Sequence, residues 1–186
     1  MKKKIETNAL SGNIVECGVG WGGTIGFIKC LQNGTKDTRQ VWGFDSFECF
    51  LKPTQHDGNI FNELSDVYNK KYGQYSLEVV KSNLHRIGLS QNDIRAVQFV
   101  KGWIPDSFDN YSGDQVSLLN VDVDIYEPTR NTLEYFWSLM QSSGIVLLDE
   151  YDFGIDLEKC PGAKKAVDEF CKKNGIDVQR HYTGRC

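Results

Sequence analysis

The stretch NVDVDIYE at residues 120–127, together with LDEY at residues 148–151, decides how this chain folds. Each acidic group follows a run of apolar residues, as buried strands of a parallel sheet often do. If the two runs are neighbouring strands, Asp122, Asp149 and Glu150 meet at one carboxyl edge of the sheet. Three carboxylates repel one another there, and Mg²⁺, or Mn²⁺ in its place, would relieve the repulsion because it prefers oxygen ligands. The sequence therefore predicts a divalent-metal site at this edge.

A glycine-rich turn, ECGVGWGGT at residues 16–24, follows the first predicted strand. Gly18, Gly20 and Gly23 have the G-x-G-x-x-G spacing, and Asp45 ends the next predicted strand, where it can accept both ribose hydroxyls. Glycines let the backbone pass close to a ligand, and the following helix offers free N–H groups. A tight turn without a ligand is the alternative, but strand, turn, helix, strand and acid come in the order of a cofactor site. On these residues alone, a nicotinamide dinucleotide fits as well as S-adenosylmethionine.

Two details favour S-adenosylmethionine. Glu16 precedes the first glycine at a strand end, where it can meet the methionine ammonium. A dinucleotide fold usually has an apolar residue there, and a pyrophosphate is repelled by a nearby acid. Hydride transfer also has no need of an acidic metal cluster, whereas some O-methyl transfers use one.

Length and composition bound these hypotheses. The chain of 186 residues is long enough for one domain with its own core, and we expect a single domain over residues 1–186. The net charge of −4 gives no reason to expect a nucleic-acid partner. No C-x-x-C pair occurs among the 6 cysteines, so free thiols in a reducing cytoplasm are expected. We find no signal peptide and no apolar run of about 18 residues that predicts a membrane span.

The hydrophobic pattern predicts strands alternating with helices, and hence an α/β, Rossmann-like fold with a mostly parallel sheet. Ligands bind such sheets outside the carboxyl ends of the strands, where every motif named above lies. A long segment over residues 47–75 has no clear period, and we interpret it as an active-site loop or lid. The predicted strands are 13–17, 40–45, 96–100, 116–121, 145–148 and 177–182, and the predicted helices are 24–31, 76–87, 128–140 and 162–173.

Several motifs together resemble the macrocin O-methyltransferase family, which methylates sugar hydroxyls of macrolide and aminocoumarin antibiotics. The resemblance covers nearly all of the chain from Gly12 onward, and it implies a class I methyltransferase fold with S-adenosylmethionine as cofactor. Besides the glycine turn and the two acidic stretches, its pieces are WGFDSFE at 42–48, KGWIPDS at 101–107, the residues PT at 128–129 and AVDEF at 166–170.

The resemblance also implies roles for individual residues. Asp122, Asp149 and Glu150 correspond to the metal ligands of the family, and Asp124 corresponds to its proposed general base. The expected acceptor is a small hydroxylated molecule, most simply a sugar with a vicinal diol, and assembly into a homo-oligomer stays open. The residues expected to contact the cofactor are Glu16, Gly18, Gly20, Thr24, Asp45, Ser46, Trp103 and Asp122.

The chain departs from the family pattern in three ways. Glu150 stands where the family usually has Asp, so a looser metal site is expected, and Val123 replaces a common Gly beside the substrate. Family members carry a longer amino-terminal region that helps cover the substrate, so the cover is expected to be incomplete here or to come from residues 47–75. Two further hypotheses stay open at this point: an NAD-linked oxidoreductase, and a non-catalytic nucleoside-binding protein with an incomplete lid.

Overall fold

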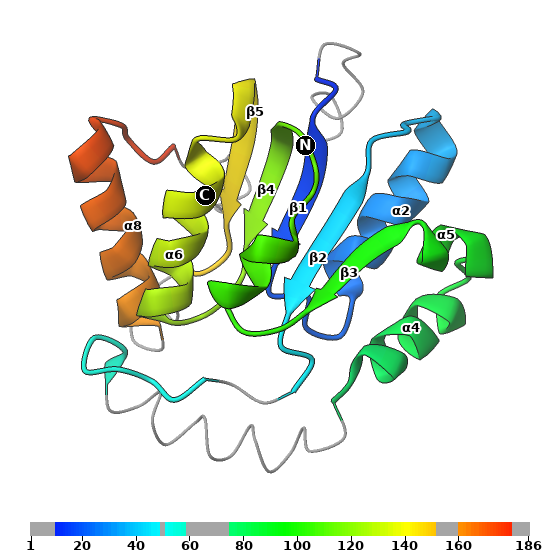
Figure 1. Cartoon of the computed structure of the whole chain (residues 1–186), viewed down its shortest axis with the longest axis horizontal. Coiled ribbons are helices and arrows are strands. Elements are labelled where there is room, and N and C mark those ends of the chain that lie inside the picture. The colour runs from blue at the N-terminus through cyan, green and yellow to red at the C-terminus, as the bar shows by residue number, and fades with distance from the viewer. Residues whose placement is uncertain (1–9, 49–50, 59–74, 152–159, 180–186) are drawn as a thin grey trace.

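The five strands of the structure, a computed structural model that describes residues 10–48, 51–58, 75–151 and 160–179, form one parallel sheet. Its strand order is β3-β2-β1-β4-β5, so the chain begins in the middle and builds outward to both sides (Figure 1). The crossing from β3 back to β4 is the switch in strand order at which ligands bind such sheets. The strands are β1 (Asn13–Cys17), β2 (Val41–Asp45), β3 (Val97–Lys101), β4 (Val116–Val121) and β5 (Met140–Leu148).

Helices connect the strands and cover both faces of the sheet. Figure 1 shows α6 and α8 beside β4 and β5, and α2, α4 and α5 near the other end of the sheet. The helices are α2 (Gly23–Thr35), α4 (Leu77–Arg86), α5 (Gln91–Arg95), α6 (Tyr126–Trp137) and α8 (Pro161–Asn174), with a 3₁₀ turn η1 (Asp106–Asn110). The predicted α/β fold with a parallel sheet is confirmed.

Successive strand residues point to opposite faces, and this alternation divides the core into two apolar clusters. Ile14 of β1 belongs to the cluster under α2 and α4, whereas the next residue, Val15, belongs to the cluster under η1, α6 and α8. Leu118 and Leu119 of β4 divide in the same way. Because both faces are covered, β1 and β4 are buried along their whole length, which is why their sequences read as continuous apolar runs.

The element bounds differ from the predicted ones in instructive places. Helix α6 begins at Tyr126, two residues before Pro128, because proline is tolerated in the first turn of a helix. Strand β5 starts at Met140, although the polar residues 141–143 follow, because Met140 pairs with Val116. Of the strand expected over 177–182, residues 177–179 form no strand, and the rest lies outside the described residues. Residues 49–50 and 59–74 of the expected lid also lie outside the described residues.

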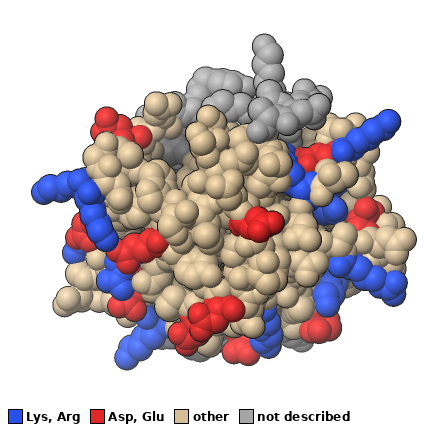
Figure 2. Space-filling model, turned by 45° about the horizontal axis from the view of Figure 1, so that its top comes forward, with Lys and Arg blue, Asp and Glu red and all other residues tan. Residues whose placement is uncertain are grey.

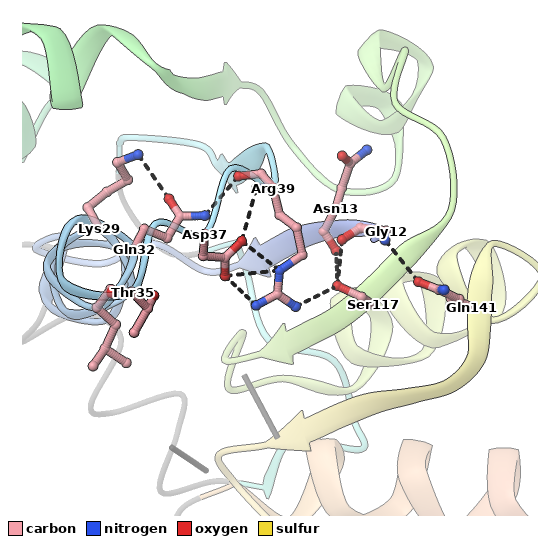
Figure 3. Close-up of polar contacts among 10 residues, drawn as sticks. Gly12, Asn13, Lys29, Gln32, Thr35, Asp37, Arg39, Ser117 and Gln141 are labelled. Atoms are coloured by element: carbon pink, nitrogen blue, oxygen red, sulfur yellow. Dashed lines mark hydrogen bonds and ion pairs between the residues drawn. The ribbon is translucent and has the colours of Figure 1, made fainter. Parts of the chain in front are cut away.

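A polar network joins the strands at their amino-terminal edge, opposite the expected site (Figure 3). Arg39 lies just before β2, and its guanidinium donates to both carboxylate oxygens of Asp37 and to Ser117 Oγ, at 3.1 Å from the latter. Ser117 in turn donates to the carbonyl of Gly12 at 2.5 Å. The side chains of Arg39 and Asp37 are 8% and 10% exposed. These contacts link the starts of β1, β2 and β4, at the edge of the sheet opposite the predicted site.

The surface gives no sign of a basic binding face in the view of Figure 2. Blue and red side chains are interspersed there around a largely uncharged centre, in keeping with the net charge of −4. Within the part of the chain that the structure describes, the helices are all too short or too polar to span a bilayer.

Candidate functional site

Backbone hydrogen bonds gather the predicted motifs at the carboxyl edge of the sheet. The amide of Gly18, just after β1, donates to the carbonyl of Phe44 at 2.8 Å, and the amide of Asp122 donates to Cys17 at 2.9 Å. The amide of Asp149 continues the series by donating to Val121 at 3.1 Å. The residues that follow β1, β4 and β5 therefore lie side by side, as the sequence predicted for neighbouring strands.

The glycine turn is built on positive φ angles and on close backbone contact. Gly18 has φ +88°, and a Cβ placed there would lie 1.6 Å from the carbonyl oxygen of Asp122. Gly20 has φ +49°, with no atom within 4 Å of where its Cβ would be. Glycine at position 18 is thus needed for packing against the β4 loop. At position 20 it leaves open space beside the turn, where a ligand can approach the backbone.

The carboxylate of Asp45, at the end of β2, holds the glycine turn in place. Its Oδ2 accepts hydrogen bonds from the amides of Val19 at 2.8 Å and Gly20 at 3.1 Å. Its Oδ1 accepts from the amide of Phe47 at 2.8 Å. The sequence predicts that this carboxylate binds a ribose, and in the structure it orients the backbone of the turn itself. Ser46 lies next to it and is partly buried.

Glu16 is a carboxyl group buried in the middle of the sheet, with 1% of its surface exposed. Its Oε1 accepts from the side-chain amide of Asn120 on β4 at 3.0 Å, and its Oε2 has no hydrogen-bond partner among the described residues. Burial raises the pKa of Glu16 to about 8, although the bond from Asn120 and the nearby hydroxyl of Thr24 act to lower that pKa. A buried oxygen without a donor is costly, and a cationic ligand group would satisfy it.

The three acids predicted to bind metal do come together. One carboxylate oxygen from each of Asp122, Asp149 and Glu150 can be chosen so that all three lie within 4.8 Å of one another, and none of these residues is fully exposed. Burial raises the pKa of Glu150 far above its ordinary value, and the charges of Asp124, Asp122 and Asp149 raise it further. Negative charge is crowded here, and this donor set is suited to a hard divalent cation.

Asp124 has a strained backbone. Its φ is +61°, uncommon for a residue with a side chain, and the amide of Ile125 donates across it to the carbonyl of Val123 at 2.7 Å. This bond defines a γ-turn, which is rare with a positive φ at its centre. The thiol of Cys160, at the start of α8, donates to Asp124 Oδ1 at 3.9 Å.

The structure also places residues that sequence analysis did not assign to the site. The hydroxyl of Tyr75, just before α4, donates to the carbonyl of Gly20 at 2.7 Å. Its ring lies edge-on to Trp21, with 5.3 Å between ring centroids. Asn120 was quoted only as the start of an acidic stretch, and its bond to Glu16 has no signal in a single sequence. Trp103, expected to contact the cofactor, follows β3 at the same edge and is 37% exposed.

The sheet and this edge define an α/β domain of the class I methyltransferase type. The solved structure of the O-methyltransferase NovP aligns with a TM-score of 0.77 over 96% of this chain and 70% of that one, at 26% identity. CalS11, a calicheamicin methyltransferase, aligns with a TM-score of 0.68 at 22% identity, covering 95% of this chain and 70% of that one, and so supports the fold.

The chain belongs to the macrocin O-methyltransferase family, because the family model described as Macrocin-O-methyltransferase (TylF) matches residues 1–181. One relative is the 8-demethyl-8-(2,3-dimethoxy-alpha-L-rhamnosyl)-tetracenomycin-C 4'-O-methyltransferase of Streptomyces olivaceus, 28% identical over 170 residues. Another is the demethyldecarbamoylnovobiocin O-methyltransferase of Streptomyces niveus, 29% identical over 171 residues. Each match covers 91% of this chain, which spans 61% and 62% of the lengths of these two relatives. The family resemblance stated from the motifs is confirmed.

Proposed function

We propose that this chain is a methyltransferase domain that moves a methyl group from S-adenosylmethionine to a hydroxyl of a sugar, with the help of a divalent metal. One observation carries the proposal: a buried acid beside a glycine turn and a cluster of three acids lie at the same sheet edge, in a chain of this family. The first feature suits a cationic nucleoside cofactor, and the second suits a hard cation.

The proposed cofactor site uses the residues around the glycine turn. Glu16 Oε2 would accept from the methionine ammonium and so gain the donor that it lacks. Asp45 and Ser46 would hold the ribose, since each carboxylate oxygen can accept more than one hydrogen bond. When bound, the cofactor supplies a methyl group on a sulfonium. Gly18, Gly20 and Thr24 would line the backbone side of this site, with Trp103 at its adenine end after β3 and Asp122 on the opposite side after β4, next to the metal site.

The proposed metal site consists of Asp122, Asp149 and Glu150. Their crowding supports a cation, Mg²⁺ or Mn²⁺, because its charge would offset both the burial and the repulsion by neighbouring acids that raise the pKa of Glu150. When bound, such a cation supplies a Lewis acid that lowers the pKa of an acceptor hydroxyl. Glu150 is one methylene longer than Asp, and one of its carboxylate oxygens lies within 4.8 Å of oxygens of Asp122 and Asp149.

Asp124 is the proposed general base. It lies two residues from Asp122 and beside the metal cluster, since its charge is, after burial, the next cause of the raised pKa of Glu150. A carboxylate is a weak base for a free alcohol, so Asp124 would accept a proton only from a hydroxyl that is already activated. Positioning is the other requirement, because in-line displacement needs the oxygen about 3 Å from the methyl carbon and opposite the sulfur.

The proposed acceptor is a small molecule with a sugar that carries adjacent hydroxyls. The names of both Streptomyces relatives describe methyl transfer to antibiotics, and one names a rhamnosyl group. A vicinal diol suits a site where a metal and a base lie close together, because one oxygen can be held while the other reacts.

Two measurements test this function. Purified protein is incubated with methyl-labelled S-adenosylmethionine, methyl α-L-rhamnopyranoside and MgCl₂, with a parallel sample in EDTA; label should enter the sugar only without EDTA. The melting temperature is then measured with S-adenosylhomocysteine and, separately, with NAD, because a ligand that binds only the native state raises it. A rise with NAD alone would favour the oxidoreductase alternative. A rise with S-adenosylhomocysteine but no transfer to any sugar would favour a binding protein.

A further inference from the structure

Asp57 is a buried acid outside the proposed cofactor and metal sites. It is 1% exposed, although it lies in the loop segment 51–58. Its Oδ2 accepts hydrogen bonds from Thr54, from the amide at 2.7 Å and from the hydroxyl at 2.8 Å. Its Oδ1 accepts from the amide of Tyr126 at 2.7 Å, a residue 69 positions away. A fully hydrogen-bonded acid at such a position joins two distant parts of the chain.

The bond to Tyr126 supplies a helix cap that the local sequence lacks. Tyr126 is the first residue of α6, and Ile125 at the N-cap position has no side-chain oxygen to accept its free amides. Asp57 performs this task from another segment, where its negative charge also suits the positive end of the helix. Gly162 of α8 completes the contact, because a Cβ there would lie 1.9 Å from Asp57 Oδ1. The carboxylate therefore fits between α6, α8 and its own loop.

The capped amide lies two residues beyond Asp124. The positive φ of Asp124 and the bond across it from Ile125 to Val123 are unfavourable in isolation. Such a conformation persists only where surrounding contacts fix the residues before and after it. On one side, the amide of Asp122 donates a hydrogen bond to the carbonyl of Cys17 at the end of β1. On the other side, Asp57 holds Tyr126.

The neighbours of Asp57 strengthen the same junction. The rings of His56 and Tyr126 lie with 4.4 Å between their centroids, and the Lys165 ammonium lies 2.8 Å from His56 Nδ1. The hydroxyl of Tyr126 donates to Glu169 of α8 at 2.6 Å. Segment 51–58 is therefore bound to the start of α6 and to α8 through two consecutive side chains.

We propose that Asp57 is a positioning residue that caps α6 from the 51–58 segment and thereby fixes the backbone of Asp124. This inference rests on the proposed role of Asp124 as the base. The position of residues 51–58 therefore determines the position of the base, so a displacement of this segment would displace the Asp124 carboxylate as well.

The test compares Asp57→Ala and Asp57→Asn with the wild-type chain and with Asp93→Ala. Asp93 is a matched control because its carboxylate accepts from Ser90 in the capping box of α5, away from the site. Amide hydrogen exchange is followed by mass spectrometry in peptides that cover residues 122–130. Loss of an N-cap changes the equilibrium constant for opening of a helix end by about tenfold. Asp57→Ala should therefore speed amide exchange at residues 122–130 by about tenfold. Asp57→Asn keeps an oxygen for Tyr126 and should restore much of the protection, and Asp93→Ala should affect only residues 90–96.

Kinetics give the second measurement, with methyl α-L-rhamnopyranoside as acceptor well below the melting temperature. Asp57→Ala should lower kcat by about tenfold or more, since misplacement of a base by about 1 Å has effects of that size or larger. Its dissociation constant for S-adenosylhomocysteine should stay within about twofold of wild type. Unchanged exchange at residues 122–130, or wild-type kcat in folded Asp57→Ala, would overturn the proposal. If the wild-type chain transfers no methyl group, the proposed function fails on this acceptor, and exchange still decides the role of Asp57.

Discussion

The buried carboxyl group of Glu16 on β1 accepts a hydrogen bond from the side-chain amide of Asn120 on β4, with 3.0 Å between Oε1 and Nδ2. The bond joins the two central strands where the glycine turn begins. It satisfies one oxygen and leaves the other without a partner among the described residues. Glu16 is therefore held in place before any cofactor binds, at a cost that a cationic ligand would offset.

The first prediction concerns pH. Burial raises the pKa of Glu16 from 4.5 to about 8, so between these values the folded chain binds a proton that the unfolded chain has lost. Stability from this group is fully present below about pH 4.5 and is lost as the pH rises through about 8. The melting temperature of the ligand-free protein should therefore fall between pH 6 and pH 8.5, by on the order of 5 °C. Scanning calorimetry at several pH values measures this.

Glu16→Gln supplies the control for that experiment, because it keeps the shape and removes the titration. The variant should melt above wild type at pH 8.5 and bind S-adenosylmethionine about tenfold or more weakly, since a hydrogen bond to a charged group is worth roughly 1.5–3 kcal/mol. Glu150 titrates in the same direction and will leave part of the slope in both proteins. Equal slopes in the two proteins would mean that Glu16 is ionised in the folded state at all these pH values.

The second prediction concerns Asp45. Asp45→Ala removes the acceptor for the amides of Val19, Gly20 and Phe47, so the turn should lose its shape as well as its ribose ligand. We expect cofactor affinity to fall about tenfold or more, with a loss of stability of about 1–3 kcal/mol. Titration calorimetry with S-adenosylhomocysteine and urea denaturation measure the two effects. An unchanged dissociation constant would remove Asp45 from the ribose site.

The third prediction contrasts two glycines of the same turn. Gly18→Ala would place a Cβ 1.6 Å from a backbone oxygen, and the strands must separate to relieve the clash. A loss of stability of about 2–4 kcal/mol is expected from crowding and positive φ together. In Gly20→Ala the new Cβ lies in open space, so only the φ of +49° is unfavourable. The expected loss of stability is about 1–2 kcal/mol. Urea denaturation of both variants provides the comparison, and similar losses would contradict it.

The positions of the main strands and of the acidic cluster could be predicted from sequence because they depend on local pattern. Strands β1 and β4 are continuous apolar runs, and each ends in the residues that carry chemistry. Once the sheet is parallel, the carboxyl ends share an edge, and the pairing of β4 with β5 in the structure makes Asp122 and Asp149 neighbours. Ser76 is also a common type of capping residue, and its hydroxyl accepts from the amide of Val79 at 3.3 Å.

The remaining features depend on contacts between residues far apart in the chain. The cap that Asp57 gives to α6 has no local signal, because a single aspartate in an irregular segment is usually a surface residue. The bond between Glu16 and Asn120 depends on the pairing of β1 with β4, which an isolated sequence does not specify. The short α5 and η1 lack enough residues to display a helical period.

The last prediction separates the proposed metal ligand from the proposed base. Asp122→Asn should weaken Mn²⁺ binding by about a hundredfold, because it removes a charged oxygen from a cluster of three acids. Asp124→Asn should keep Mn²⁺ binding and lower kcat by about 10²–10⁴-fold, the range expected for a general base. Asp124→Asn should bind S-adenosylhomocysteine like wild type, as should wild type in EDTA. Electron paramagnetic resonance of Mn²⁺ and a labelled-methyl assay give the two measurements. If Asp124→Asn loses the metal and Asp122→Asn keeps it, the two roles are exchanged, and full activity in EDTA would discard the metal from the mechanism.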